Sequence, residues 1–177
     1  TGYGYEFQNP DRVGNLGAEE YLGILAAGKW LQQQKEVDAN RIGVFGGSYG
    51  GYLTAFALGK NSDIFKAGVD IHGVHNRERK PDGTTAPDLD LAVKLSWDSS
   101  PSKYVDTWKS PVLIIHGDDD QNVAFTQSLD LVNRLKDKKV AVEYLVVPDE
   151  THHWMVFANL LSVKQATVDF LIKHLKK

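Results

Sequence analysis

The first feature of the chain is a series of short apolar runs, each about as long as a buried strand. They lie at residues 42–45, 67–71, 112–116 and 141–147. Segments in which apolar residues recur at helical spacing lie between them. Continuous apolar strands that alternate with helices are typical of a parallel sheet covered on both faces. The pattern therefore predicts an α/β fold with four mainly parallel strands and flanking helices.

Helical periodicity predicts the elements around these strands. The expected helices lie at residues 19–34, 52–58, 89–95, 125–132 and 154–175. Gly28 is on the inward face of the first helix. Glycine lowers helix stability by about 1 kcal/mol relative to alanine, so its presence there predicts a close approach to a strand. The second helix is expected to stop at Gly59. Residues 1–16 and 76–87 lack a period and are predicted to be loops.

Three of these helices are expected to bury apolar residues along one face. In the first helix the residues on this face are Tyr21, Ile24, Leu25, Gly28 and Leu31. In the helix near residue 125 they are Phe125, Leu129 and Val132. In the last helix they are Phe157, Leu161, Val168, Leu171 and Leu175.

Composition excludes several classes of protein. At 177 residues, with 42% apolar and 24% charged residues, the chain has the composition of one globular domain. A net charge of -3 and short like-charge runs do not favour a nucleic acid or membrane partner. The chain has no cysteine, which excludes disulfides, thiolate metal sites and cysteine catalysis. It begins at Thr1 in a Gly/Tyr-rich run, and we expect it to be a fragment of a longer protein.

Residues 46–50 fit the pattern G-x-S-x-G, between a predicted strand and a predicted helix. In this arrangement a sharp turn lifts the serine hydroxyl, here that of Ser48, above the end of a sheet. Gly46 and Gly50 are expected to lie close together, where a Cβ on either would collide. The amide of Tyr49 can then donate to an oxyanion at the start of the helix. The alternative is that Ser48 is only a helix N-cap.

A nucleophilic serine needs a base and an acid that orients the base. Polar residues follow the third and fourth predicted strands, at 116–123 and 148–153. The order Ser, Asp, His is that of α/β-hydrolases. Asp118, Asp119 and Asp120 could instead form a solvated turn or bind a hard cation. No H-E-x-x-H spacing supports zinc, so no metal is expected, and His116 is expected to be a hydrogen-bonded structural residue.

These motifs together resemble a known family. They are Gly46-Gly47-Ser48-Tyr49-Gly50-Gly51, His116-Gly117-x-x-Asp120-x-x-Val123 and Pro148-Asp149-Glu150-x-His152. They are similar to the catalytic domain of prolyl oligopeptidase-like serine peptidases, a group that includes dipeptidyl peptidases and acylaminoacyl peptidases. Thr1-Gly2-Tyr3-Gly4 and Val37-Asp38-x-x-Arg41-Ile42 extend the resemblance over essentially the whole chain.

The resemblance implies roles for particular residues. It implies a triad of Ser48, Asp120 and His152, with the Tyr49 amide as one oxyanion donor and no cofactor. It also implies a substrate pocket bordered by Val74, Asn122 and Val123.

The chain also departs from the family pattern. His153 stands where a glycine is usual, so His152 and His153 are both candidates for the base, and register favours His152. The family's N-terminal propeller and the first strands of the hydrolase sheet are absent from residues 1–177, which we interpret as a partial catalytic domain. The second oxyanion donor normally comes from one of those strands. Losing one donor costs roughly 2.7 to 4 kcal/mol, so the isolated chain is expected to be nearly inactive.

The sequence therefore favours a serine peptidase that cleaves peptide substrates through an acyl-enzyme. One alternative is an esterase that uses the same triad. A second alternative is a non-catalytic fragment that acts in assembly, because the strand at 42–45 would be an unpaired edge. We expect self-association or association with the missing N-terminal portion.

Overall fold

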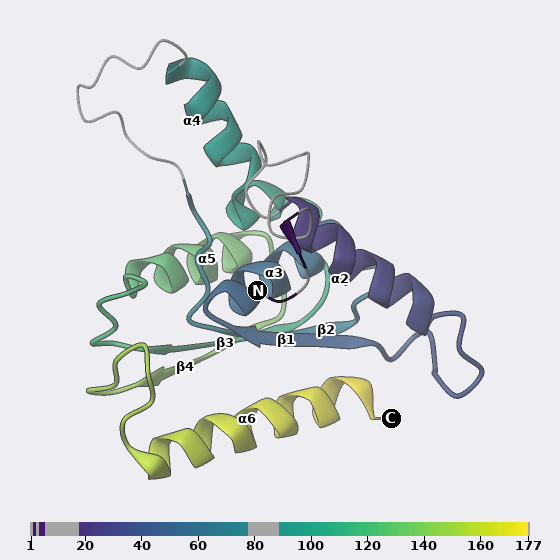
Figure 1. Cartoon of the computed structure of the whole chain (residues 1–177). Helices are drawn as coiled ribbons and strands as arrows, with labels where there is room; N and C mark the ends of the chain where they lie inside the picture. The colour runs from purple at the N-terminus through teal and green to yellow at the C-terminus, as the bar shows by residue number, and fades with distance from the viewer. Residues whose placement is uncertain (1, 3, 6–17, 78–88, 177) are drawn as a thin grey trace.

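The four predicted strands form one sheet in a computed structural model that describes residues 2, 4, 5, 18–77 and 89–176. All three neighbouring pairs in the sheet are parallel (Figure 1). In spatial order the strands are β1 (Gly43–Gly47), β2 (Ala67–Ile71), β3 (Val112–Gly117) and β4 (Val142–Val147). The predicted α/β fold with a parallel sheet is confirmed.

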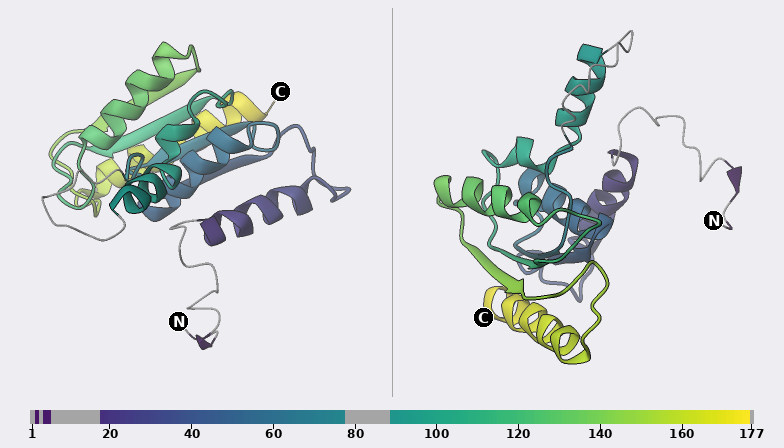
Figure 2. Two further views of the ribbon diagram at one scale, coloured as in Figure 1. Left: turned by 90° about the horizontal axis from the view of Figure 1, so that it is seen from above. Right: turned by 90° about the vertical axis from the view of Figure 1, so that its left-hand side faces the viewer.

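Helices cover both faces of this sheet. They are α2 (Ala18–Leu31), α3 (Tyr49–Lys60), α4 (Leu89–Asp98), the 3₁₀ turn η1 (Pro101–Tyr104), α5 (Thr126–Asp137) and α6 (Phe157–Leu175). Helix α6 lies alone below the sheet, whereas α2, α3 and α5 lie above it (Figure 1). Helix α4 stands away from the rest of the molecule (Figure 2).

The core consists of two apolar clusters, one on each face of the sheet. Successive residues of β3 point to opposite faces, so Ile114 belongs to the cluster under α3 and α5, and Ile115 to the cluster over α6. Both side chains are at most 2% exposed. Burial on both faces is the physical reason for the unbroken apolar runs in the sequence.

The prediction that α3 stops at Gly59 is wrong. The helix continues to Lys60, and the amide of Asn61 still donates to the carbonyl oxygen of Ala57. Gly59 is instead a packing position, because a Cβ there would lie 3.0 Å from the Cβ of Tyr104.

The close approach predicted at Gly28 exists, but the neighbour is not a strand. A Cβ at this position would lie 2.7 Å from the ring of Phe65 and 2.9 Å from Ile64. Both residues precede β2 in the turn that follows α3. Gly28 therefore lets α2 pack closely on that turn.

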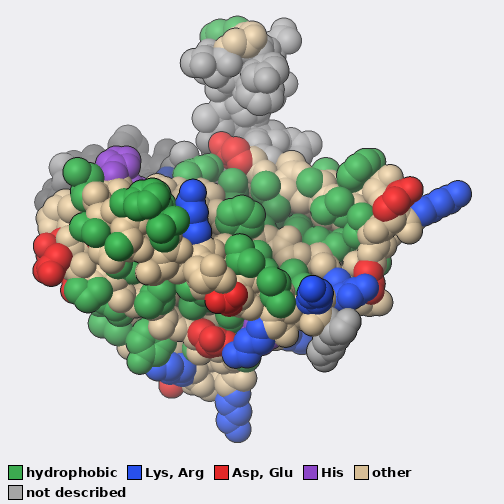
Figure 3. Space-filling view, turned by 90° about the horizontal axis from the view of Figure 1, so that it is seen from below, with side chains coloured by type: hydrophobic (Ala, Val, Ile, Leu, Met, Phe, Trp, Pro, Cys, Tyr) green, Lys and Arg blue, Asp and Glu red, His purple; other side chains and the backbone are tan. Residues whose placement is uncertain are grey.

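The buried face predicted for α6 is wrong in part. Phe157, Leu161 and Val168 are 71%, 51% and 50% exposed, and Figure 3 views the molecule from this side. The residues of α6 that are buried are Val163, Thr167 and Phe170. These three share one helical face at spacings of four and three residues, which packs on β2 and β3. Leu171 and Leu175 are half-buried beside them.

Helix α5 shows a smaller difference of the same kind. Leu129 is 50% exposed and Phe125 precedes the helix, whereas Val132 is buried as predicted. The inward face is completed by Ser128, Leu131 and Leu135.

Two remaining expectations concern loops and membranes. Most of the loops predicted at 1–16 and 76–87 lies outside the described residues. Among the described helices, none is both long and apolar enough to span a bilayer.

The two phenylalanines of α6 allow a direct test of its orientation. Phe170 is 4% exposed in the lower cluster, so Phe170→Ala should lower the free energy of unfolding by about 3 to 5 kcal/mol. Phe157→Ala, at an exposed position, should change it by about 0.5 kcal/mol or less. Urea unfolding of the two variants measures both values, and equal losses would contradict this orientation.

Candidate active site

Ser48 occupies the sharp turn between β1 and α3. Its backbone has φ 56° and ψ -116°, and its N–H donates to the carbonyl oxygen of Ile71 over 2.9 Å. A Cβ at Gly46 would lie 2.6 Å from the backbone of Gly50, so the predicted close approach is confirmed. The prediction for Gly50 itself is wrong, because a Cβ there would meet nothing within 4 Å.

The turn also requires a glycine at position 51. A Cβ there would lie 2.5 Å from Oδ1 of Asp70 and 2.8 Å from the carbonyl oxygen of Ile71. The beginning of α3 therefore packs directly against the end of β2. The pattern G-x-S-x-G ends at Gly50 and therefore does not identify Gly51.

The structure brings together the three residues that the sequence singled out. Nε2 of His152 lies 2.8 Å from Oγ of Ser48, and Nδ1 of His152 lies 2.7 Å from Oδ2 of Asp120. The three side chains follow β1, β4 and β3, whose carboxyl ends meet at one edge of the sheet. Ser48 is the N-cap residue of α3 by position, but its side chain makes no hydrogen bond that caps the helix.

The neighbouring histidine does not occupy this position. His153 is exposed, and its ring centroid lies 5.6 Å from that of His152. In the described part of the chain, only His152 contacts both the hydroxyl and the carboxylate.

Asp120 is a buried carboxylate that accepts hydrogen bonds at both oxygens. Oδ1 accepts the N–H groups of Asn122 and Val123 at 2.8 and 2.9 Å, and Oδ2 accepts from His152 and His116. Burial alone would raise the pKa of this carboxyl, but the bonds from Val123, His152 and Asn122 outweigh burial and lower the pKa. Asp120 is therefore ionised and accepts the N–H at Nδ1 of His152; in the neutral ring this leaves Nε2 to accept from the Ser48 hydroxyl.

His116 helps to hold Asp120. Its Nε2 lies 3.0 Å from the carbonyl oxygen of Val123 and 3.2 Å from Oδ2 of Asp120, and both of these atoms are acceptors. Nε2 must therefore carry the proton, and Nδ1 accepts from the hydroxyl of Ser128 at 2.7 Å. Burial lowers the pKa of His116, which keeps the ring neutral. The predicted hydrogen-bonded structural role is confirmed.

His72, at the end of β2, lies directly against the His152 ring. The two ring centroids are 4.2 Å apart, and Trp154 stacks on His72 at 5.3 Å. His72 is 5% exposed, and its Nδ1 has no hydrogen-bond partner among the described residues. Burial, with the nearby His152, lowers the pKa of His72 to about 4, so the ring is neutral near pH 7.

His72, Asp120 and His152 also form a group of metal-ligand types. One ligand atom from each lies within 4.8 Å of the others, and no other such group occurs in residues 18–77 and 89–176. The Asp120 carboxylate and both His152 nitrogens already take part in the bonds described above. A metal ion there would displace those bonds.

The loop that carries His152 is held by other carboxylates. Oδ1 of Asp118 accepts the N–H of Asp149 at 2.7 Å, which joins the loops after β3 and β4. The buried Glu150 accepts the N–H groups of Met155 and Val156 at 2.8 and 2.9 Å. These bonds, led by that of Met155, lower the pKa of Glu150.

Asp118 and Asp119 are exposed, as a solvated turn would be, but Asp120 is buried.

The remaining predicted site residues lie around this centre. Tyr49 is the first residue of α3, and its N–H makes no hydrogen bond within the described residues. Val123 is buried, Val74 is half-buried and Asn122 is exposed. Their contact with a substrate remains a prediction.

A parallel sheet with a serine on a strand-to-helix turn, beside a histidine and an aspartate from later strand ends, defines an α/β-hydrolase. Within this class the chain belongs to the prolyl oligopeptidase family, whose sequence profile matches residues 1–177.

Individual relatives agree with this assignment. The acylamino-acid-releasing enzyme of Mus musculus is 30% identical over 157 residues, which are 78% of this chain and 21% of that protein. Dipeptidyl-peptidase 5 of Porphyromonas gingivalis is 27% identical over 189 residues, covering 99% of this chain and 28% of that protein. The solved acylaminoacyl peptidase of Pyrococcus horikoshii matches with a TM-score of 0.80 and 28% identity, covering 100% of this chain and 31% of that one. The chain thus spans less than a third of each of these proteins.

His72 gives the fold a specific pH dependence. Its folded-state pKa of about 4 is below the usual 6.5, so between these values the unfolded chain binds a proton that the folded chain does not. The free energy of unfolding should therefore fall as the pH decreases from about 6.5 to 4. The total loss is about 1.4 kcal/mol for each unit by which the folded-state pKa lies below the usual value. His72→Phe keeps a stacking ring but cannot titrate, and should lose less stability over this range.

Urea unfolding at about pH 7 and pH 4.5 measures this difference. His153→Phe, which changes an exposed histidine, is the matched control and should follow the parent chain. An unchanged acid loss in His72→Phe would contradict the assignment to His72.

Proposed function

We propose that this chain carries the catalytic triad of a serine peptidase, with Ser48 as nucleophile, His152 as base and Asp120 as the acid that orients His152. The observation that supports this most strongly is the continuous hydrogen-bonded chain from Asp120 through His152 to Ser48. A serine that only capped a helix, or an exposed loop histidine, would have no reason to make these contacts.

The proposed acylation step follows from the tautomer of His152. Nε2 takes the proton of Ser48 as Oγ bonds to the acyl carbon, and the carbonyl π electrons move onto its oxygen. The resulting imidazolium is stabilised by Asp120, while the neutral His72 ring adds no like charge beside it. His152 then gives the proton to the leaving amine as the C–N bond breaks.

The oxyanion and the second half-reaction require further groups. The Tyr49 N–H, at the positive end of α3, is the proposed first donor to the oxyanion. Water then attacks the acyl-enzyme, gives a proton to His152, and the proton returns to Ser48 as the acid product leaves. A second donor is expected from a part of the longer protein outside these residues, which we propose completes the hydrolase domain.

The proposed substrates are peptides. The names of the relatives, acylamino-acid-releasing enzyme and dipeptidyl-peptidase, describe peptide-bond cleavage and support a peptide substrate here. An esterase would use the same triad, so turnover of a matched peptide anilide and ester by the intact protein separates the two activities.

The two adjacent histidines provide the sharpest test of the triad. In the intact protein, His152→Ala should lower kcat by about 10⁴-fold or more, since the base is removed. His153→Ala should leave kcat within a few-fold, because this side chain is exposed and outside the hydrogen-bonded chain. The rate at which a fluorophosphonate labels Ser48 should likewise fall strongly in His152→Ala and change little in His153→Ala. A large loss in His153→Ala, with His152→Ala active, would reverse the assignment.

We also propose that the free edge of β1 pairs with another segment, from the longer protein or from a second copy. Among the described strands, β1 pairs only with β2, and Phe45 on β1 is 64% exposed. An unpaired apolar edge is an opening for strand addition.

Charge placed on each edge strand tests this second proposal. The 177-residue chain should self-associate in sedimentation velocity, and Phe45→Lys should yield monomer because a buried charge is costly at a paired edge. Val146→Lys, on the opposite edge strand β4, is the matched control and should still associate. A parent chain that is monomeric would contradict pairing between copies.

A further inference from the structure

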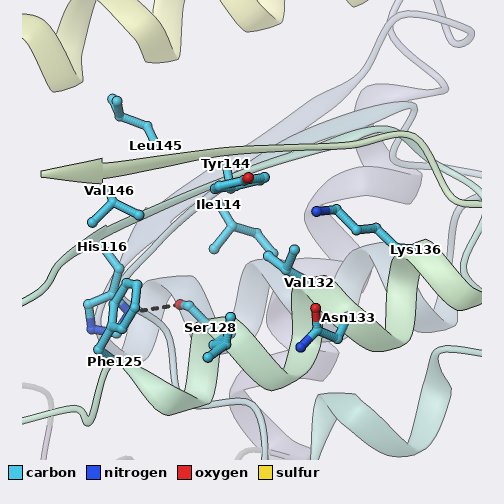
Figure 4. A pocket seen from close by; sticks show the side chains of 11 residues that line it. Ile114, His116, Phe125, Ser128, Val132, Asn133, Lys136, Tyr144, Leu145 and Val146 are labelled. Carbon is cyan, nitrogen blue, oxygen red and sulfur yellow. Dashed lines mark hydrogen bonds between the residues drawn. The ribbon is translucent and has the colours of Figure 1, made fainter.

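A cavity of about 310 Å³ lies between α5 and the outer strand β4. Figure 4 shows side chains of α5 and β4 that point toward one another across it, with β3 behind them. None of Ser48, Asp120 and His152 lines the cavity, and His116 lies between the cavity and Asp120. Its volume is at the lower end of the range for small-molecule sites.

The walls of the cavity are mainly apolar. Ile114 and Val132 form a buried floor, at 2% and 6% exposure. Tyr144 and Leu129 stand at the open side and are 58% and 50% exposed. An apolar group that entered would be removed from water on several sides, which favours binding.

One end of the cavity carries a positive charge. Lys136, on α5, places Nζ 4.6 Å from the ring centroid of Tyr144, and Asn133 lies one turn earlier on the helix. In the described part of the chain, no carboxylate lies within ion-pair distance of Lys136. Among the residues that line the cavity, Lys136 is the only lysine.

At the opposite end of the cavity, the polar side-chain atoms already have hydrogen-bond partners. His116 and Ser128 line it, and they bond to each other in the pair drawn in Figure 4. The His116 Nε2–H is directed to Val123 and Asp120. This end therefore offers an apolar surface, and only the Lys136 end offers a free charge.

We propose that this cavity binds a small amphipathic anion, such as a medium-chain carboxylate. The apolar tail lies over Ile114 and Val132, and the carboxylate lies at Lys136 and Asn133. A cation that contacts an aromatic ring but pairs with no carboxylate in the described part of the chain, beside an apolar cavity, complements a ligand of this polarity. The headgroup gains a charge-assisted hydrogen bond while the tail is buried. This ligand takes no part in the proposed hydrolytic reaction.

Titration calorimetry of the intact protein with octanoate tests the proposal, with octan-1-ol as the neutral probe. A ligand of this size should bind with a Kd of about 0.1 to 1 mM. Lys136→Gln should weaken octanoate by about tenfold and leave octan-1-ol unchanged, since only the charged headgroup loses its partner. Leu129→Trp, which places a larger ring at the open side, should abolish binding of both probes.

Lys139→Gln is the matched control, because it removes an equal charge outside the cavity and should bind octanoate like the parent. Thermal unfolding checks that each variant is folded. The proposal is overturned if octanoate does not bind, if both lysine variants weaken it equally, or if sedimentation shows a second copy closing the cavity. Binding is measured without hydrolysis, so the triad can fail its test while this site stands, and the reverse.

Discussion

The Asp120 carboxylate is where the separate parts of the site are joined. It accepts hydrogen bonds from its own loop through Asn122 and Val123, from His116 on β3, and from His152 after β4. An ionised carboxylate can accept all four, and no neutral side chain of this size can replace it. The arrangement depends in turn on the parallel sheet, because the carboxyl ends of parallel strands lie at the same edge of the sheet. Loss of this one charge would release the loop and the base together.

The strands and the hydrogen-bonded centre could be predicted because each has a local cause in the sequence. A strand buried on both faces must be apolar throughout, as β3 is, and the polar residues that follow such strands must meet at one edge. The orientation of α6 has no such local cause. Its apolar residues lie on more than one side, including Phe157 and Phe170, so packing against β2 and β3 decides which are buried.

Three features of the site could not be found from local patterns. Glu150 holds the His152 loop through backbone N–H groups, and these donors converge only when the loop has folded. His72 stacks on His152 because β2 and β4 lie in the same sheet with β3 between them, a relation set by strand order. Gly51 matters because of its distance from Asp70 across the turn. The contacts of His72 and Gly51 are long-range, and those of Glu150 depend on the folded shape of an irregular loop. Sequence periodicity reports only regular spacing between neighbours along the chain.

The connection between β4 and α6 is held by two carboxylates. Glu150 accepts the backbone N–H groups of Met155 and Val156, and Asp120 accepts the ring N–H of His152. Asp120 and Glu150 both have lowered pKa values in the folded chain, so their contribution to stability is full above the usual carboxyl pKa and is lost as the pH falls through the lowered values. The apolar layers on the two faces of the sheet do not depend on protonation. Acid should therefore free one short connection, and His152 with it, before the packed body of the molecule comes apart.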